Sequence, residues 1–243
     1  MPASFERPRM PPLSLPPQAA LFLDVDGTLL EFAPAPHLVV VPPDLAGVLR
    51  RLRGQLQGAL AVVTGRPIEQ VDGLFGDAPY AVAGEHGAAI RVAPGAAIHH
   101  VALPALAPEW LTQAEEVVQA HPGALLEPKS RGFVFHYRNA PELGPVLHEA
   151  AQRIVAGREA EYRLLPAHMA WEVKPSAADK GTAVAALMAE PPFRGRVPVY
   201  VGDDVTDEDG MRVAREAGGL GLRVAEAFGD PEGVRIWLRG LAK

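Results

Sequence analysis

The chain has 243 residues, a formal net charge of −6 and no cysteine. Without cysteine there can be no disulfide, thiol nucleophile or thiolate metal site, and this composition fits a reducing cytoplasm. The acidic charge argues against a nucleic-acid partner, and no run approaches the ~18 apolar residues that a membrane span requires. We therefore expect a cytoplasmic monomer that binds neither nucleic acid nor a membrane.

The elements predicted along the chain alternate between strands and helices, after a proline-rich leader at residues 1–17. Short apolar runs predict the strands, and apolar residues at helical spacing predict the helices. The strands are expected at residues 20–24, 59–63, 80–83 and 197–201, and the helices at residues 44–57, 67–75, 179–189 and 207–217. This alternation predicts an α/β fold with a doubly wound parallel sheet.

A different pattern occupies the middle of the chain, from residue 96 to residue 174. The order there is helix, hairpin, helix, hairpin, which predicts a small α+β unit. The unit is inserted into a larger core domain, which would comprise residues 18–95 and 175–243. We expect the insert to form a cap over the active site and to select the substrate, because a lid can contact the leaving group and exclude water.

The most informative motif is LFLDVDGTL, in which an apolar strand ends in Asp24 and Asp26 before a Gly-Thr turn. Side chains two apart on a strand point to the same side, so these carboxylates are expected to lie together at the strand's carboxyl end. Two such carboxylates repel each other unless a cation or a shared proton intervenes. A plain Asx turn would account for Asp26 but not for Asp24.

A second strand also ends in carboxylates, at Gly202-Asp203-Asp204. Clustered carboxylate oxygens suit a hard cation such as Mg²⁺. Asp207 and Asp209 follow closely. The simpler interpretation of these two is that they favour a helix N-terminus, whereas the neighbouring Asp203-Asp204 pair favours a role in supporting the Mg²⁺ ligands.

Two further segments are suited to bind an anion. Thr64-Gly65-Arg66 ends a strand just before a helix, where a hydroxyl and backbone N–H groups can hold a phosphate. Lys180-Gly181-Thr182 begins a helix, and a lysine at that position opposes the helix dipole unless a bound anion compensates.

These four motifs, in this order, resemble those of the haloacid dehalogenase superfamily of phosphotransferases. The resemblance implies a Rossmann-like core and phosphoryl transfer through an aspartyl phosphate. It assigns Asp24 as the nucleophile, Asp26 as the general acid and base, and Thr64 and Lys180 as ligands of the phosphoryl oxygens. It also implies Mg²⁺ between Asp24, Asp203 and the backbone carbonyl of Asp26. The full set of expected metal residues is Asp24, Asp26, Asp203 and Asp204.

Three further segments, one in the cap and two in the core, narrow the resemblance to one family of this superfamily. Leu126-Glu127-Pro128-Lys129, together with GEHG at residues 84–87 and GDDVTDED at residues 202–209, is similar to the trehalose-6-phosphate phosphatases. That similarity implies hydrolysis of trehalose 6-phosphate, with Glu127, Lys129 and Glu172 binding hydroxyls of the distal glucose. The remaining candidate substrate residues are Arg66, His86, Arg138 and Lys174.

Several alternatives remain open at this point. The core motifs also suit a phosphatase of another sugar phosphate, such as sucrose phosphate or mannosyl-3-phosphoglycerate. A non-enzymatic phosphoacceptor module combines similar residues, but such modules are shorter and lack a cap. Glu127 with Lys129, and Glu172 with Lys174, could equally form the solvated face of amphipathic strands. His86 could simply cap a turn, and His99-His100 is expected at an exposed strand edge.

Overall fold

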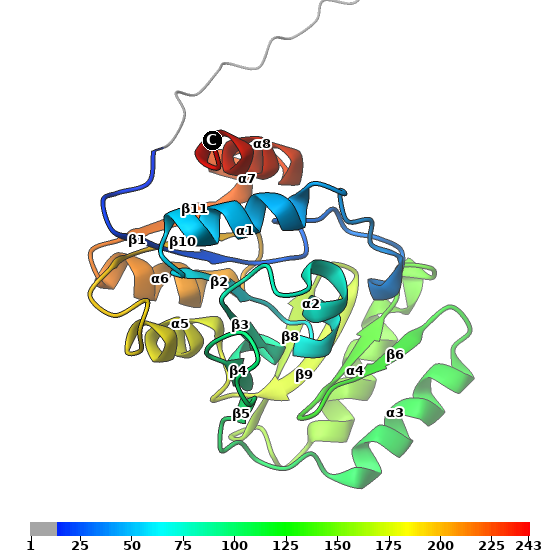
Figure 1. Ribbon diagram of the computed structural model, residues 1–243. Helices are drawn as coiled ribbons and strands as arrows, with labels where there is room; N and C mark the ends of the chain where they lie inside the picture. The colour runs from blue at the N-terminus through cyan, green and yellow to red at the C-terminus, as the bar shows by residue number, and fades with distance from the viewer. Residues whose placement is uncertain (1–13) are drawn as a thin grey trace, which may run out of the picture.

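The computed structural model describes residues 14–243, so the leader predicted at residues 1–17 falls mostly outside the described residues. The chain forms two sheets, one of seven strands and one of four (Figure 1). Among the described residues no helix is both long and apolar enough to cross a membrane.

The large sheet has parallel pairing over most of its width. Its strands, in spatial order, are β11 (Leu220–Arg223), β10 (Val197–Gly202), β1 (Ala19–Leu23), β2 (Leu60–Val63), β3 (Ala81–Gly84), β4 (Ala89–Arg91) and β5 (His99–His100). The first five are parallel, and β4 and β5 extend the sheet as an antiparallel edge. The predicted doubly wound sheet is therefore confirmed, and each predicted core strand and helix matches an observed element to within one or two residues at each end.

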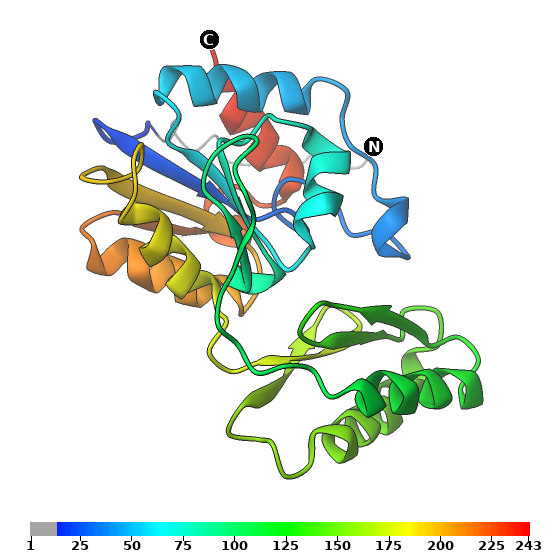
Figure 2. The same ribbon diagram turned by 60° about the horizontal axis from the view of Figure 1, so that its bottom comes forward.

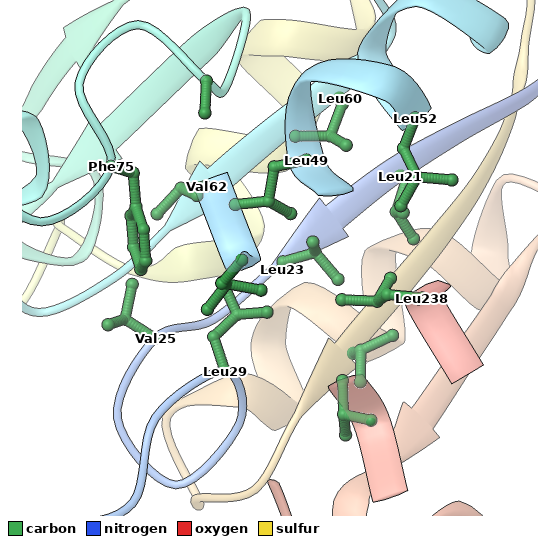
Figure 3. Close-up of a cluster of buried hydrophobic side chains, with 14 of the residues drawn as sticks. Leu21, Leu23, Val25, Leu29, Leu49, Leu52, Leu60, Val62, Phe75 and Leu238 are labelled. Atoms are coloured by element: carbon green, nitrogen blue, oxygen red, sulfur yellow. The ribbon is translucent and has the colours of Figure 1, made fainter. Parts of the chain in front are cut away.

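Both faces of this sheet are buried, which explains why its central strands are continuous apolar runs. Leu21 and Leu23 of β1 pack on one face with α1 (Leu45–Gln55), α2 (Ile68–Phe75) and α8 (Pro231–Leu241), as Figure 3 shows for part of this cluster. Phe22 points to the other face, against α5 (Lys180–Met188) and α6 (Asp207–Glu216). A short helix, α7 (Val224–Ala227), precedes α8.

The inserted unit has the predicted order of helix, hairpin, helix, hairpin. Its elements are α3 (Pro108–Ala120), β6 (Leu125–Pro128), β7 (Phe133–His136), α4 (Gly144–Val155), β8 (Tyr162–Ala167) and β9 (Ala170–Pro175). The strands form an antiparallel sheet in the order β6-β7-β9-β8. Phe133, Phe135 and Val173 pack with apolar residues of α3 and α4. Figure 2 shows this unit, in green, as a separate body beside the large sheet. The predicted α+β fold of the inserted unit is confirmed.

One edge of the large sheet extends further than the sequence suggested. β5 pairs with β4 in the large sheet, although its residues fall after residue 95, where the predicted core segment ends. The sequence predicts His99 and His100 at a strand edge, but it does not indicate that they pair with β4, because so short a segment carries no pairing signal of its own. Both histidines are exposed at the sheet edge, as expected. Short 3-10 turns complete the described chain at η1 (Pro36–Leu38), η2 (Glu85–Gly87) and η3 (Pro141–Leu143).

Candidate active site

The predicted core residues meet at the carboxyl ends of the central strands of the large sheet. Asp24 follows β1, Thr64 follows β2 and Asp203 follows β10, and parallel strands present their carboxyl ends on the same side. Lys180 reaches this edge from the first turn of α5. The α/β core thus places residues that are far apart in sequence around one point.

A buried lysine lies between two carboxylates at this point. Lys180 Nζ donates to Asp24 Oδ1 at 2.8 Å and to Asp207 Oδ1 at 2.6 Å. Burial alone would lower the pKa of Lys180, but the charges of Asp207 and Asp24 outweigh it and raise the pKa above its usual value. We infer that Lys180 remains a cation and can bind anionic oxygens beside Asp24.

The carboxylates themselves are crowded. Ligand oxygens of Asp24, Asp203 and Asp207 all lie within 4.8 Å of one another. Burial and the neighbouring charge of Asp207 raise the pKa of Asp24 well above its usual value, against the opposing effect of Lys180. The same two causes raise the pKa of Asp203 to about 7. Added positive charge near the cluster would therefore stabilise the ionised carboxylates.

Asp207 has a different role from Asp24 and Asp203. The sequence suggested a supporting position for it but not its bonds to Lys180 and Tyr200. Its Oδ1 accepts from Lys180 Nζ at 2.6 Å and Tyr200 OH at 2.7 Å, and its Oδ2 accepts backbone N–H groups of Asp203 at 3.1 Å and Asp204 at 3.0 Å. Four donors occupy about all the lone pairs of a carboxylate. Asp207 is thus an anchor that shapes the loop after β10. Its spacing of four residues from Asp203 was the available signal.

Asp24 and Asp203 are left as the carboxylates best placed for a cation. Thr28 Oγ1 lies 3.4 Å from both Asp24 Oδ2 and Asp203 Oδ1, so these oxygens face the same space. Asp203 also packs on Gly27, where a Cβ would lie 2.1 Å from Asp203 Oδ2. An all-oxygen donor set of this kind fits a hard divalent cation.

The other two predicted metal residues lie beside this cluster. Asp204 Oδ1 accepts the backbone N–H of Val205 at 2.6 Å. The carboxylate of Asp26 forms a two-point pair with Arg66, from Nε to Oδ2 at 2.7 Å and from Nη2 to Oδ1 at 2.7 Å. Arg66 Nη1 also donates to Gln70 Oε1 at 3.2 Å. Neither carboxylate belongs to the group of converging ligand oxygens.

Thr64 is set up to donate a hydrogen bond. Its Oγ1 accepts the backbone N–H of Arg66 at 3.2 Å, which leaves the hydroxyl hydrogen available for an anion.

In the cap, Glu127 has two cationic or polar partners. Lys129 Nζ lies 2.6 Å from Glu127 Oε1, and His136 Nε2 lies 2.8 Å from Glu127 Oε2. Burial alone would raise the pKa of Glu127, but these two partners lower it to about 2. Lys129 Nζ also donates to Gly65 O at 3.0 Å, in the loop after β2 of the core. Glu127 is therefore a fixed carboxylate rather than a solvated surface residue.

The second glutamate of the cap, Glu172, is held by the core. His86 Nε2 lies 2.8 Å from Glu172 Oε2, and both side chains are buried. Burial lowers the pKa of His86 to about 4. Burial alone would raise the pKa of Glu172, but His86 and the charges of Lys129 and Lys174 lower it to about 2. A neutral imidazole donating to a carboxylate is the state that these directions favour.

The last two predicted substrate residues are Lys174 and Arg138. Lys174 is buried beside Glu172, and burial lowers its pKa to about 8. Arg138 donates to Ala33 O and to His168 O, and its guanidinium lies 5.5 Å from the centre of the Phe32 ring.

One cavity brings the two units together. Its lining includes these predicted residues: Asp24, Asp26, Thr64, Arg66, His86, Glu127, Lys129, Arg138, Glu172, Lys180 and Asp204. Lys174 and Asp203 are absent from that lining. The structure therefore places Asp24 and Lys180 of the core and both glutamates of the cap around one space, an arrangement suited to a polar, anionic ligand.

Comparison with known proteins identifies the family. A sequence profile of the trehalose-phosphatase family matches residues 22–229. The chain is 40% identical over 206 residues to the trehalose-6-phosphate phosphatase of Escherichia coli, and 38% identical over 205 residues to a probable trehalose-phosphate phosphatase of Sinorhizobium fredii. Each alignment covers 84% of this chain and 77% of the relative. The C-terminal domain of a Candida albicans trehalose-6-phosphate phosphatase has the same fold, with a TM-score of 0.76 at 19% identity over 92% of each chain. The chain belongs to the trehalose-phosphatase family.

Proposed function

We propose that this protein hydrolyses trehalose 6-phosphate to trehalose and phosphate, with Mg²⁺ as cofactor and a phosphorylated Asp24 as intermediate. The observation that carries the proposal is the shared cavity, in which Asp24 and Lys180 of the core face the same space as Glu127 and Glu172 of the cap. Family membership supports the substrate class.

In the first step an Asp24 oxygen attacks phosphorus, the bond from phosphorus to the sugar oxygen breaks, and the leaving oxygen takes a proton from Asp26. In the second step water attacks phosphorus, gives its proton to Asp26, and the bond from phosphorus to Asp24 breaks to release phosphate. Lys180 and the hydroxyl of Thr64 bind the phosphoryl oxygens. These donors offset negative charge that an anionic nucleophile and an anionic phosphate would otherwise bring together.

Asp24, Asp203 and the backbone carbonyl of Asp26 would hold the metal, and Asp204 would shape the adjoining loop. A bound Mg²⁺ supplies positive charge that favours ionised Asp24 and shields the phosphoryl group. This charge is needed because burial and Asp207 raise the pKa of Asp24.

In the structure Arg66 holds the carboxylate of Asp26. Each oxygen of Asp26 accepts one N–H of the guanidinium and keeps a second acceptor position, which is available for proton exchange. We infer that the incoming substrate draws Arg66 away, because Arg66 lines the cavity and anionic oxygens are good bidentate partners for arginine.

The cap would recognise the disaccharide. Carboxylates accept hydrogen bonds from sugar hydroxyls. Glu127 and Glu172 are ionised groups that line the cavity from β6 and β9, the strands on either side of β7. We assign residues 96–174 to this cap unit, with β5 paired to the core, and residues 18–95 and 175–243 to the catalytic unit. His86, Arg138 and Lys174 would support the substrate site.

We further propose that the protein acts as a monomer in the cytoplasm.

The decisive experiment measures phosphate release from trehalose 6-phosphate, sucrose 6-phosphate, glucose 6-phosphate and mannosyl-3-phosphoglycerate in the presence of Mg²⁺. Asp24→Asn protein and excess EDTA are the controls. A preference for trehalose 6-phosphate that both controls abolish is the expected result. Metal-dependent turnover of another sugar phosphate would overturn the assignment of the substrate. Failure to hydrolyse any of the four compounds would overturn the proposal that the protein is a phosphatase.

A further inference from the structure

The cap sheet presents its two glutamates in one row. In the strand register, Val134 of β7 lies opposite Glu127 of β6 on one side and opposite Glu172 of β9 on the other. Residues opposite one another across antiparallel strands point to the same face of a sheet. His136 is two residues further along β7, so it shares this face and lies diagonal to Glu127.

Among the residues that the structure describes, the side chain of His136 has a single hydrogen-bond partner. Its Nε2 lies 2.8 Å from Glu127 Oε2, and its buried Nδ1 has none. The ring is almost completely buried in the wall of the cavity. Its polar chemistry is therefore directed at one oxygen of Glu127.

The two oxygens of Glu127 are divided between two donors. Lys129 binds Oε1 at 2.6 Å and His136 binds Oε2. A carboxylate has about four acceptor positions, so two remain for ligand hydroxyls once these donors are in place. Lys129 also binds the core at Gly65 O, whereas His136 makes no such second bond within the described chain.

We propose that His136 is a positioning residue that acts through Glu127 and fixes the carboxylate in the orientation that binds the hydroxyls of the non-phosphorylated part of the substrate. The proposal rests on the proposed function, since it requires Glu127 to bind substrate. It makes His136 a determinant of affinity for the sugar portion, and not of the phosphoryl chemistry at Asp24.

The test is a double-mutant cycle with Glu127→Ala, His136→Ala and the double variant, using the full chain with Mg²⁺. KM and kcat are measured for trehalose 6-phosphate and for a small aryl phosphate that lacks the sugar. We expect His136→Ala to raise the KM for the disaccharide phosphate about tenfold, the usual size of effect for losing a hydrogen bond to a charged group. The aryl phosphate should show no comparable change.

The cycle separates an indirect role from a direct one. If His136 acts only through Glu127, the double variant has the same KM as Glu127→Ala, because no carboxylate remains to be positioned. Effects that multiply in the double variant would overturn the proposal, since they would mean that His136 contacts substrate itself. Equal losses on both substrates would also overturn it, in favour of a structural role.

Two further variants distinguish a loss of positioning from a loss of folding. His136→Gln retains an amide N–H near the position of Nε2 and should recover most of the lost affinity; failure to recover it while the variant remains folded contradicts the proposal. His121→Ala is a matched control, because His121 is in the same cap and its imidazole bonds to Val117 O at the end of α3, away from Glu127. This variant should leave both KM values unchanged. If the parent prefers another sugar phosphate, the proposed substrate fails but the cycle is run on that substrate. If Glu127→Ala then leaves KM unchanged, the inference about His136 is overturned independently.

Discussion

His86 Nε2 lies 2.8 Å from Glu172 Oε2, and this pair joins the η2 turn of the core to strand β9 of the cap. The preceding residue, Glu85, accepts the backbone N–H of Ser130 at 3.0 Å from the β6-β7 turn. Both core residues have positive φ, 49° for Glu85 and 56° for His86, a left-handed conformation that the Cβ of any residue other than glycine disfavours. A strained turn after β3 thus binds the cap at two points beside the candidate active site.

The role of Glu172 can be tested through substrate size. Glu172→Ala should raise the KM for trehalose 6-phosphate by at least about tenfold, because it removes an ionised acceptor from the cavity, while a small aryl phosphate is hydrolysed almost as before. The measurement is steady-state kinetics on both substrates. Glu149→Ala, at an exposed position on α4, is the matched control. Parallel losses on both substrates would argue against a recognition role.

Replacing the nucleophile should separate activity from folding. Asp24→Asn is expected to reduce phosphate release by more than about a thousandfold, because a neutral amide cannot form the aspartyl phosphate. In the presence of EDTA its thermal unfolding midpoint should be no lower than that of the parent, since burial and Asp207 disfavour the ionised carboxylate. Substantial remaining turnover would exclude Asp24 as the nucleophile.

Asp203 and Asp204 should differ in their effect on metal binding. Asp203→Asn is expected to raise the Mg²⁺ concentration for half-maximal activity about tenfold or more, because its carboxylate belongs to the converging oxygens. Asp204→Asn should change it much less, because Asp204 Oδ1 is bonded to Val205 N. Mg²⁺ titrations of the two variants decide the matter, and a reversed order would assign the metal to Asp204.

Gly27 is required by both its backbone and its surroundings. Its φ is +77°, and an added Cβ would lie 2.1 Å from Asp203 Oδ2. Gly27→Ala should therefore lower the free energy of unfolding by about 1 kcal/mol or more and raise the Mg²⁺ requirement by displacing Asp203. Denaturant unfolding and Mg²⁺ titration test both effects. Gly73→Ala, at a helical position with open space, is the control and should retain full activity.

The ion pairs of Glu127 predict a pH dependence of stability. Its pKa is about 2 in the folded protein against an ordinary value of 4.5, so the folded state favours the ionised form. This contribution is present above about pH 4.5 and is lost as the pH falls toward 2, and its full size is on the order of 3 kcal/mol. Glu127→Gln should be less stable than the parent at neutral pH, and the difference should shrink below pH 4.5. Urea unfolding at several pH values measures it, and a difference independent of pH would contradict this account.

Much of the architecture could be predicted because its signals are local. The apolar runs ending at Asp24, Val63 and Gly202 are continuous because both faces of a doubly wound sheet are covered, and the helical spacing of apolar residues marks the helices between them. The order of elements in the cap followed from the same periodicities. Even the clustering of Asp24, Thr64 and Asp203 could be expected, because parallel strands end at one edge of a sheet.

The α/β core, the inserted cap and the candidate site residues could all be proposed from local sequence patterns. Which of those residues bind one another depends on the folded structure. It paired Asp26 with Arg66, 40 positions away, and His86 with Glu172, 86 positions away, and it made Asp207 an anchor for Lys180 and Tyr200. Periodicity reports which face a side chain occupies, but a hydrogen bond depends on the packing of distant elements to within a fraction of an ångström. That packing is a property of the whole folded chain, and no short segment encodes it.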